Sequence, residues 1–478
     1  MVYRGKPSRS CSCCRKRKLK CDLAEPSCGQ CLRACLVCSG YRDTTQLRVQ
    51  DESYTARQKA IGHRIEQLPR SLKVSVDDKA RNAFFFHYVS GFSRTYDVLE
   101  SLYEPVNSHL GASLDAVSLA FFAFRFNHAR AAQIARVRYS KALPLVNQAI
   151  KYPESATTDP TLLAVLFLDL FEKMTDERTR GSRAWMSHVK GGLALAELRG
   201  KTKLTTYTGL RLSIRLFVNL VISCACADIE PPTGLNKLRS DLEPFVNKHD
   251  PKWRITCLVL RYTFLRATIQ KNALDDADVI YQAKQIDSEY VTVAQSMPHS
   301  WYYETKHLEK PSERVLEQHY IVYSDHLVAQ TWNVLRATRI SLNDLIRKHA
   351  RLSILSSTDA LHYVCESDAA ANIIDSMAYE ICASVPPFTL FDSVDMSDDL
   401  AVAVHRSRCY TLLFPLYVAG TSASHLTNIK RWTIDQLNYL STSVGIQNAA
   451  LVSQILNTAP WTNPWVVYNM LGGYAFAA

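Results

Sequence analysis

The chain has 478 residues, of which 47% are hydrophobic and 21% are charged, so it is long enough to bury a large core, and its composition excludes a globally disordered protein. The formal net charge is +11, and residues 1–50 hold eleven Lys and Arg against three Asp and Glu, which leaves a nearly neutral remainder. A basic end on a nearly neutral body is typical of an arm that binds a polyanion.

The cysteines are distributed as unevenly as the charge. Of the fourteen, eight lie before residue 40, and the others are scattered between Cys224 and Cys409. The start of the chain lacks the basic and then apolar segments of a secretory signal, so we expect an intracellular protein whose cysteine cluster binds metal rather than forming disulfides. The longest apolar runs, at 162–171 and 216–227, are too short to span a bilayer, so no membrane partner is expected.

Six of the eight N-terminal cysteines form a two-fold repeat. A Cys-x2-Cys pair presents two sulfurs to one ion, and a six-residue spacer can return a third sulfur, so each half supplies three thiolates. Two tetrahedral zinc ions need eight ligand positions, which six thiolates fill only if two of them bridge both ions. The repeat therefore predicts a binuclear cluster with two Zn²⁺ ions. It reads Cys11-x2-Cys14-x6-Cys21 and, after six residues, Cys28-x2-Cys31-x6-Cys38.

Cys13 and Cys35 stand outside this repeat. An alternative uses all eight cysteines in two separate four-thiolate sites, with Cys35-x2-Cys38 as a third pair. That arrangement abandons the two-fold repeat that six cysteines already satisfy. We therefore interpret Cys13 and Cys35 as free thiols within the spacers.

The two six-residue spacers differ in chemistry. The first reads RKRKLK (15–20) and the second reads LRACLV (32–37). If each forms a short helix, the first offers cations and the second offers apolar surface for packing. Five cations in six residues, held at both ends by metal, predict a rigid probe for the DNA major groove, where Lys and Arg donate to guanine O6 and N7. The predicted DNA-binding residues are Arg15, Lys16, Arg17, Lys18 and Lys20, with Arg9 on the phosphate backbone.

This stretch resembles the fungal zinc binuclear-cluster transcription factors. The family pattern CxxCRxRKxKCD is met by 11–22, and the pattern PxCxxCxxxxxxC is met by 26–38. Gly40-Tyr41 is similar to the GY that usually follows. Six spaced cysteines with this intervening chemistry make a highly specific resemblance.

The resemblance implies a domain in which six cysteines hold two zinc ions, with Cys11 and Cys28 as the bridging thiolates. It also implies that Pro26 shapes the loop between the halves and that Lys18 reads a CGG-type base triplet. None of the departures from the family pattern removes a ligand. The departures are the extra Cys13 and Cys35, Ser10 in place of a frequent glycine, and Ser39 in place of a frequent proline.

Residues 1–42 are therefore expected to form the DNA-binding domain, followed by a polar linker at 43–76. Tyr54, Ile61, Ile65 and Leu68 fit heptad positions, but Gln58 interrupts them and only about two repeats fit, whereas coiled coils need about three or four. A fraying helical linker is favoured over a zipper, and dimerisation, as in a homodimer, is left open.

Residues 77–478 show the periodicity of helix after helix, with scarce strand alternation and only 16 glycines in the whole chain. Asp159 is predicted to cap a helix that starts at Pro160 and is apolar nearly all round, as a central buried helix is. Further helices are predicted at 184–198, 325–348 and 370–385, the last ending before Pro386-Pro387. The predicted fold class is mostly α: a small N-terminal zinc cluster plus a large all-α body.

The body resembles the helical regulatory domain attached to many fungal factors of this class. The resemblance rests on weak patterns whose order along the chain makes it firm, and it implies a domain that regulates activity, contacts partners or senses small molecules. The patterns are AWMSHVKGGLALAELRG, HLVAQTWNVLRATRISL, EICASVPP, LLFPLYVAG and WTIDQLNYLSTSVGIQNA.

No enzyme class has an anchor in this sequence. RGKT at 199–202 is similar to the end of a phosphate-binding loop, but Leu195 occupies the position of the required glycine, and HExxH, GxSxG and GxGxxG do not occur. Cys224 and Cys226 lie in an apolar run without adjacent cations, which indicates buried, inert thiols. The sequence predicts a protein that is not an enzyme.

The expected function is a nuclear, zinc-dependent, sequence-specific DNA-binding regulator of RNA polymerase II transcription. Its partners would be double-stranded DNA and the transcription machinery or co-regulators, and the basic spacer would also suit a nuclear localisation signal. The narrower expectation is a regulator of a pathway or a metabolic gene cluster. The rival is a zinc-stabilised protein-interaction module, such as a ubiquitin-ligase-like finger, but such fingers rarely concentrate five cations at their contact face.

Overall fold

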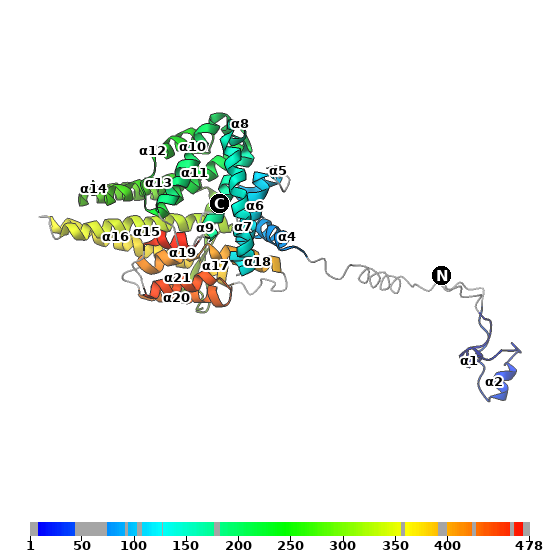
Figure 1. Ribbon diagram of the computed structural model, residues 1–478. Helices are drawn as coiled ribbons and strands as arrows, with labels where there is room; N and C mark the ends of the chain where they lie inside the picture. Colours follow the sequence, from blue (N-terminus) through cyan, green and yellow to red (C-terminus); the bar gives the residue numbers. More distant parts are fainter. Residues whose placement is uncertain are drawn as a thin grey trace. The chain divides into compact units, whose positions relative to one another are not determined.

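The chain divides into two compact units, Met1–Val74 and Ser75–Ala478 (Figure 1). The division falls inside the predicted linker, and the heptad positions at 54–68 lie outside the described residues. The computed structural model describes residues 8–43, 74–90, 94–102, 108–126, 128–175, 182–354, 359–390, 399–422, 427–458 and 463–471.

The described part of the N-terminal unit is built around two short helices, α1 (Ser12–Lys16) and α2 (Gly29–Arg33). Its core consists of four fully buried cysteines, against which Cys13, Cys21, Cys38 and Tyr41 pack. A core made almost entirely of cysteines buries too little apolar surface to hold so small a unit together, which agrees with the metal binding predicted from the sequence.

We call the second unit the body. The described residues of its N-terminal part form helices joined by short turns, with no strand among them. Its helices α6 and α7 pack against each other, and α9 packs against both of them. The elements are α4 (Val76–Ala83), η1 (Phe84–Ser90), η2 (Arg94–Val98), α5 (Leu99–Leu102), α6 (His109–Phe126), α7 (Ala129–Lys151), α8 (Pro153–Ala156), α9 (Asp159–Thr175), α10 (Ser182–Arg199), η3 (Lys201–Thr205), α11 (Tyr207–Ala227) and α12 (Thr233–Leu242).

The C-terminal part of the body centres on the long helix α15, which packs against α14, α16 and α19. Figure 1 shows α15 and α16 side by side. The elements are α13 (Pro251–Gln270), α14 (Asp276–Gln295), η4 (His299–Trp301), β1 (Glu304–His307), β2 (His319–Val322), α15 (His326–Ile354), α16 (Ala360–Ala383), α17 (Pro386–Thr389), α18 (Asp399–Tyr410), α19 (Leu413–Ser422), α20 (Thr427–Thr442), α21 (Gln447–Thr458) and α22 (Pro464–Met470).

The mostly α fold class is confirmed, and the helices predicted at 184–198, 325–348 and 370–385 correspond to α10, α15 and α16. Helix α9 is buried over most of its length, as its apolar pattern predicts. Its start differs from the prediction by one residue. Asp159 is the first helical residue rather than the cap, and the Thr158 hydroxyl accepts from the Thr161 amide instead (3.4 Å). Asp159 also forms an ion pair with Arg199 (2.6 Å).

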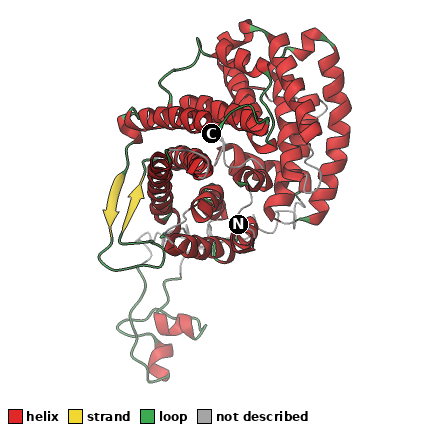
Figure 2. Ribbon diagram, turned by 90° about the vertical axis from the view of Figure 1, so that its left-hand side faces the viewer, coloured by secondary structure: helices red, strands yellow, loops and turns green. Residues whose placement is uncertain are grey.

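The body is not entirely helical, because β1 and β2 form an antiparallel pair with Glu304 opposite Val322 and His307 opposite His319. Figure 2 shows the two strands side by side at the margin of the helical body. All four β1 residues are exposed, and in β2 only Ile321 is buried. Without a buried face, neither strand needs alternating polarity, which is why the sequence pattern did not reveal the hairpin.

Helix α11 extends beyond the apolar run at 216–227 that the sequence shows. With its full span of 21 residues it is the one helix of the described residues long and apolar enough to cross a membrane, yet 78% of its apolar window is buried inside the body. Such burial is the property of a core helix. Cys224 and Cys226 are buried on it, as predicted, and burial raises the pKa of Cys224 to about 12.

Candidate metal centre and nucleic-acid interface

The two halves of the cysteine repeat have the same backbone course. In each half a Cys-x2-Cys pair, which we call a knuckle, lies at a short helix, and a left-handed turn then brings the third cysteine back. Cys11 and Cys28 precede α1 and α2 in extended conformation, and one helical turn later each helix presents its second cysteine. The Cys11 sulfur also accepts from the Cys14 amide (3.4 Å). After each helix one residue turns left-handed, Lys18 in the first half and Cys35 in the second, both with φ of 51°. The two-fold repeat of the sequence is therefore also a repeat of the backbone, in which Cys35 occupies the position of Lys18.

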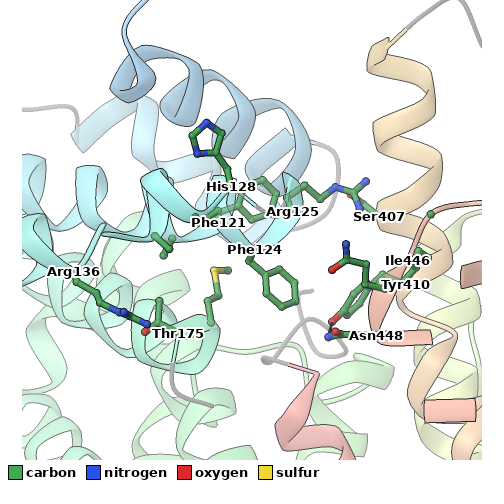
Figure 3. A pocket seen from close by; sticks show the side chains of 17 residues that line it. Phe121, Phe124, Arg125, His128, Arg136, Thr175, Ser407, Tyr410, Ile446 and Asn448 are labelled. Carbon is green, nitrogen blue, oxygen red and sulfur yellow. Dashed lines mark hydrogen bonds between the residues drawn. The ribbon is translucent and has the colours of Figure 1, made fainter. Parts of the chain in front are cut away.

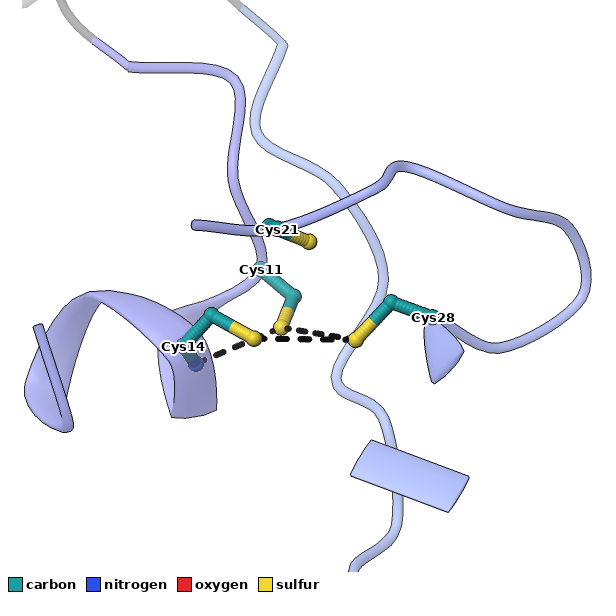
Figure 4. A group of neighbouring side chains, drawn as sticks. All are labelled: Cys11, Cys14, Cys21 and Cys28. Carbon is teal, nitrogen blue, oxygen red and sulfur yellow. Dashed lines mark hydrogen bonds between the residues drawn. The ribbon is translucent and has the colours of Figure 1, made fainter. Parts of the chain in front are cut away.

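Six sulfurs gather in two groups of four, and in each group all the sulfurs lie within 4.8 Å of one another. Both groups contain Cys11 and Cys28, which are fully buried at the centre of the unit. Figure 4 shows the first group, with its side chains converging from both halves. The first group is Cys11, Cys14, Cys21 and Cys28, and the second is Cys11, Cys28, Cys31 and Cys38.

The sulfur spacing fits tetrahedral zinc. Cys11 lies 3.7 Å from Cys28 and 3.7 Å from Cys31, and Cys14 lies 3.6 Å from Cys28, sulfur to sulfur. A tetrahedron with Zn–S bonds of about 2.3 Å has edges of about 3.8 Å, whereas a disulfide would bring two sulfurs to about 2.05 Å. All the cysteines of this unit are free thiols. The arrangement can hold two four-coordinate ions that share two thiolates.

The metal-free thiols differ in acidity. Burial raises the pKa of Cys14 to about 12 and also raises that of Cys31. The backbone amides of Cys28 and Gly40 instead lower the pKa of Cys38 to about 7. Zinc must therefore displace protons from the buried thiols, so its binding releases protons and weakens as the pH falls.

Contacts outside the sulfurs join the two halves. The Asp22 carboxylate accepts from the Gly29 amide (3.0 Å) at the start of α2, and the Tyr41 hydroxyl donates to the Ala24 carbonyl. The space beside Gly29 is filled by this carboxylate, since an added Cβ would lie 2.7 Å from Asp22 Oδ2. Asp22 is thus the ionic cap that aligns the second knuckle with the first.

Replacing Asp22 with Ala should weaken zinc binding about five-fold, because a lost helix cap costs about 1 kcal/mol and folding and metal binding are one equilibrium. Competition with a chromophoric chelator at fixed pH measures the change. Glu25→Ala is the matched control, since Glu25 is a neighbouring exposed acid and should leave the affinity unchanged. Equal effects of the two substitutions would show that Asp22 acts only through net charge.

The predicted DNA-contacting cations of the first spacer are all exposed. Helix α1 ends at Lys16, so the spacer is one helical turn followed by the left-handed Lys18, not a single helix as expected. The return of Cys21 to the metal requires this reversal of the chain. The Arg15 guanidinium donates to the Ser10 carbonyl. The Arg42 amide donates to the Arg9 carbonyl (3.2 Å), which places Arg9 beside the segment that follows Cys38.

The expectation that the second spacer packs through apolar side chains is wrong. Leu32, Leu36 and Val37 are 64%, 45% and 92% exposed, because the described core of this unit consists of cysteines, with only Tyr41 packed against them as a larger apolar side chain.

The two cysteines outside the repeat belong to neither sulfur group, as the six-ligand interpretation predicts. The Cys13 thiol donates to the Val37 carbonyl oxygen (3.7 Å), and Cys35 is exposed. Pro26 lies in the loop between the halves after a cis peptide bond with Glu25. Among the described residues no other group of three or more metal-ligating side chains occurs.

Comparison with known proteins agrees with this geometry. The family described as "Fungal Zn(2)-Cys(6) binuclear cluster domain" matches residues 9–48. A search of curated proteins found no match, and a search of solved structures found none either. The match covers both knuckles and both spacers. The chain therefore carries a fungal Zn(2)-Cys(6) binuclear cluster domain, the zinc-binding domain of fungal DNA-binding transcription factors.

Proposed function

We propose that this protein is a nuclear regulator of RNA polymerase II transcription that reads a CGG-type triplet through its first spacer. Two observations together carry the proposal: two sulfur groups share Cys11 and Cys28, and an exposed basic spacer occurs on one half only. Metal at both ends of that spacer holds its cations in one geometry, which lowers the entropy lost on meeting a groove.

In this proposal the six repeat cysteines are the zinc ligands, and Cys11 and Cys28 bridge the ions. Arg15, Lys16, Arg17, Lys18 and Lys20 face DNA, with Lys18 donating to base edges and Arg9 following the phosphates. The second spacer offers Arg33 as its one cation, with exposed apolar side chains around it. This asymmetry supports binding through one half of the repeat, on a single triplet per chain.

Lys18→Ala should weaken binding to a CGG-containing duplex by about 1–3 kcal/mol and leave binding to a random duplex nearly unchanged, because only base contacts carry sequence information. Fluorescence anisotropy with the zinc-loaded full chain, at several salt concentrations, measures both affinities. Lys18 already places a Cβ at a positive φ, and alanine keeps that Cβ, so this substitution leaves the backbone strain unchanged. Lys18→Gly removes the cation and this strain together and should show the same loss of sequence-specific binding.

Arg9→Ala is the control for a phosphate contact. It should weaken both duplexes to a similar extent and reduce the salt slope by about one. An equal loss on both duplexes for the Lys18 variants would refute the base-reading role of Lys18.

The body is proposed to be the regulatory domain of this factor, and homodimerisation and contacts with co-regulators are proposed with it. The support is the ordered set of sequence patterns, which fall on α10, α15, α16, α19 and α20–α21. The biological role that we propose for the whole protein is control of a pathway or of a metabolic gene cluster. Binding sites mapped on genomic DNA, together with transcript changes after deletion of the gene, test this proposal; sites without CGG triplets would contradict it.

A further inference from the structure

Helix α7 lies in a stretch of the body that carries positive charge without any acid. Between Asp115 and Glu154 the sequence holds six Lys and Arg but no Asp or Glu. The body as a whole is almost neutral, with 40 Lys and Arg against 39 Asp and Glu in residues 75–478. The stretch around α7 is therefore far more basic than the rest of this unit.

Helix packing neutralises comparable stretches elsewhere in the body. Residues 198–227 and 251–274 each hold five Lys and Arg and no acid. Six of these ten cations form ion pairs with acids of other segments, as Lys271 does with Glu230 (2.6 Å). A basic stretch in this body is thus normally matched by acids when the helices pack.

The cations of α7 are an exception. Among the described residues only Arg138 of this helix forms an ion pair, with Asp77 (3.0 Å). The other four cations are exposed, and none has a carboxylate within ion-pair distance in the described part of the chain. We call these four the basic face: Arg130, Arg136, Lys141 and Lys151.

The basic face lies on one side of α7. At about 100° per residue its four positions fall within an arc of about 140°, opposite the side that the helix buries. The row from Arg130 to Lys151 is about 30 Å long at about 1.5 Å per residue, which is close to one turn of B-DNA, roughly 34 Å. The buried side consists of Ala131, Ala135, Ala142, Val146 and Ala149.

Arg136 also meets no acid where α7 approaches the C-terminal helices. Figure 3 shows Arg136 and Thr175 on one side of a cavity of about 290 Å³ and Tyr410 and Asn448 on the other. Neither Asp nor Glu is among the described residues that line this cavity. The positive charge of the basic face is therefore not cancelled from this side.

A row of unmatched, exposed cations suits a partner with regularly spaced negative charge. Lys and Arg side chains that meet phosphates release counterions, which favours binding whatever the base sequence is. In the proposed function the zinc domain of the same chain already holds duplex DNA. Because the body is tethered to that domain, it meets this DNA at a much higher effective concentration than it meets any other polyanion.

We propose that the basic face of α7 binds the phosphate backbone of the DNA duplex that the zinc domain holds. This second contact rests on the proposed function for its DNA, but it uses a different unit and reads no bases. It adds affinity and salt dependence on DNA that extends beyond the triplet. The helical body is thereby a DNA-contacting part of the protein.

Fluorescence anisotropy of the zinc-loaded full chain with a short and a long duplex tests the proposal. Both duplexes carry one central CGG triplet. The short one has about 12 base pairs, which leaves about half a turn on each side of the triplet, and the long one has about 40 base pairs. At about 0.1 M salt the long duplex should bind at least ten-fold more tightly, with a salt slope steeper by about 2–4, since each phosphate contact adds about 0.9.

Replacing all four residues of the basic face with alanine should remove the preference for the long duplex and leave binding to the short duplex unchanged. The combined substitutions are Arg130→Ala, Arg136→Ala, Lys141→Ala and Lys151→Ala. Alanine is the best helix former, so α7 should stay folded. Zinc content and thermal unfolding of each variant verify this.

The matched control removes the same net charge from elsewhere in the body. It replaces with alanine four exposed cations that also have no carboxylate within ion-pair distance among the described residues, and it should keep the preference for the long duplex. These residues are Lys190, Lys310, Lys348 and Arg351.

Three results would overturn the proposal. They are an unchanged preference for the long duplex in the α7 variant, equal losses in the α7 variant and the control, and loss of binding to poly-glutamate alone, which would assign the face to an acidic protein segment. The same duplexes with the triplet scrambled separate this test from the proposed function. If the triplet gives no gain over the scrambled sequence, triplet reading fails, whereas the length preference and its loss in the α7 variant still decide the role of the basic face.

Discussion

Cys11→Ser should remove both zinc ions from the chain, although only one ligand is replaced. The Cys11 sulfur belongs to both groups of four cysteine sulfurs, and it lies 3.7 Å from the Cys28 sulfur and 3.7 Å from the Cys31 sulfur. Structural zinc supplies about 10–16 kcal/mol to small domains of this kind, so losing the shared ligand should unfold the whole unit. Zinc released per chain, measured with a chromophoric chelator after protease digestion, should fall from two to near zero. Binding to the CGG-containing duplex should be lost with it.

Cys13→Ser and Cys35→Ser are the matched controls, because they change the same residue type within the same short segment. Both variants should keep two zinc ions and full DNA affinity, since neither sulfur belongs to a group of four. Loss of an ion from either variant would sink the six-ligand cluster and favour two separate four-thiolate sites. Thermal unfolding of the body, a separate unit, should be the same in all of these variants.

Arg336→Ala should destabilise the body by about 3 kcal/mol, the largest effect that we expect from a single substitution in this unit. Arg336 is completely buried on α15 and donates to Glu380 (2.9 Å), to the Tyr323 hydroxyl (2.5 Å) and to Asn333 (3.1 Å). Breaking a buried pair by removing one partner costs about 3–5 kcal/mol. The lower end applies here because the Glu380 side chain is 29% exposed and water can solvate it once its partner is gone.

The Arg336 side chain also contacts residues next to the β1–β2 hairpin, so it links the hairpin to the helices. Its guanidinium lies 5.4–5.8 Å from the centres of three aromatic rings, two of which flank β1 and β2. Each such contact adds about 0.5–2 kcal/mol. The rings belong to Tyr303, Tyr323 and Trp332.

Urea unfolding followed by circular dichroism measures the loss, with Arg351→Ala as the control. Arg351 is an exposed arginine on the same helix, and its loss should change the free energy of unfolding by less than about 0.5 kcal/mol. Arg336→Met keeps most of the volume without the charge and should fall between the two. If Arg336→Ala matches Arg351→Ala, the ion pair and the ring contacts contribute nothing net to the stability of the body.

Much of the metal centre could be predicted from spacing, because knuckles and short spacers are local structures. The x2 and x6 intervals bring three sulfurs of one half together, and the count of six thiolates for two tetrahedral ions requires two bridges. The structure brings together those six cysteines and leaves Cys13 and Cys35 out. The left-handed turn at Lys18 was not predicted, because no glycine or asparagine marks it.

Other predictions were wrong where the surroundings of a residue are formed by parts of the chain that are distant in the sequence. The second spacer was expected to offer apolar surface for packing, but among the described residues of this unit Leu32 and Val37 remain exposed. Asp159 has the residue type of a cap, yet it is the first residue of α9 and forms an ion pair with Arg199 of another helix, a contact that its own segment does not reveal. The hairpin escaped notice because its strands bury almost nothing.

The sequence by itself determined the set of six cysteines that cluster, the basic spacer and the helical class of the body, because these follow from short-range spacing and periodicity. Only the tertiary structure decided which cations remain without acids. Arg336 and Arg136 are both helical arginines, but helix packing gives Arg336 the partly exposed carboxylate of Glu380 at 2.9 Å and leaves Arg136 exposed, with no carboxylate within ion-pair distance among the described residues. Helix packing brings together side chains that are far apart in the sequence, so the residue pattern of a single segment does not reveal their contacts.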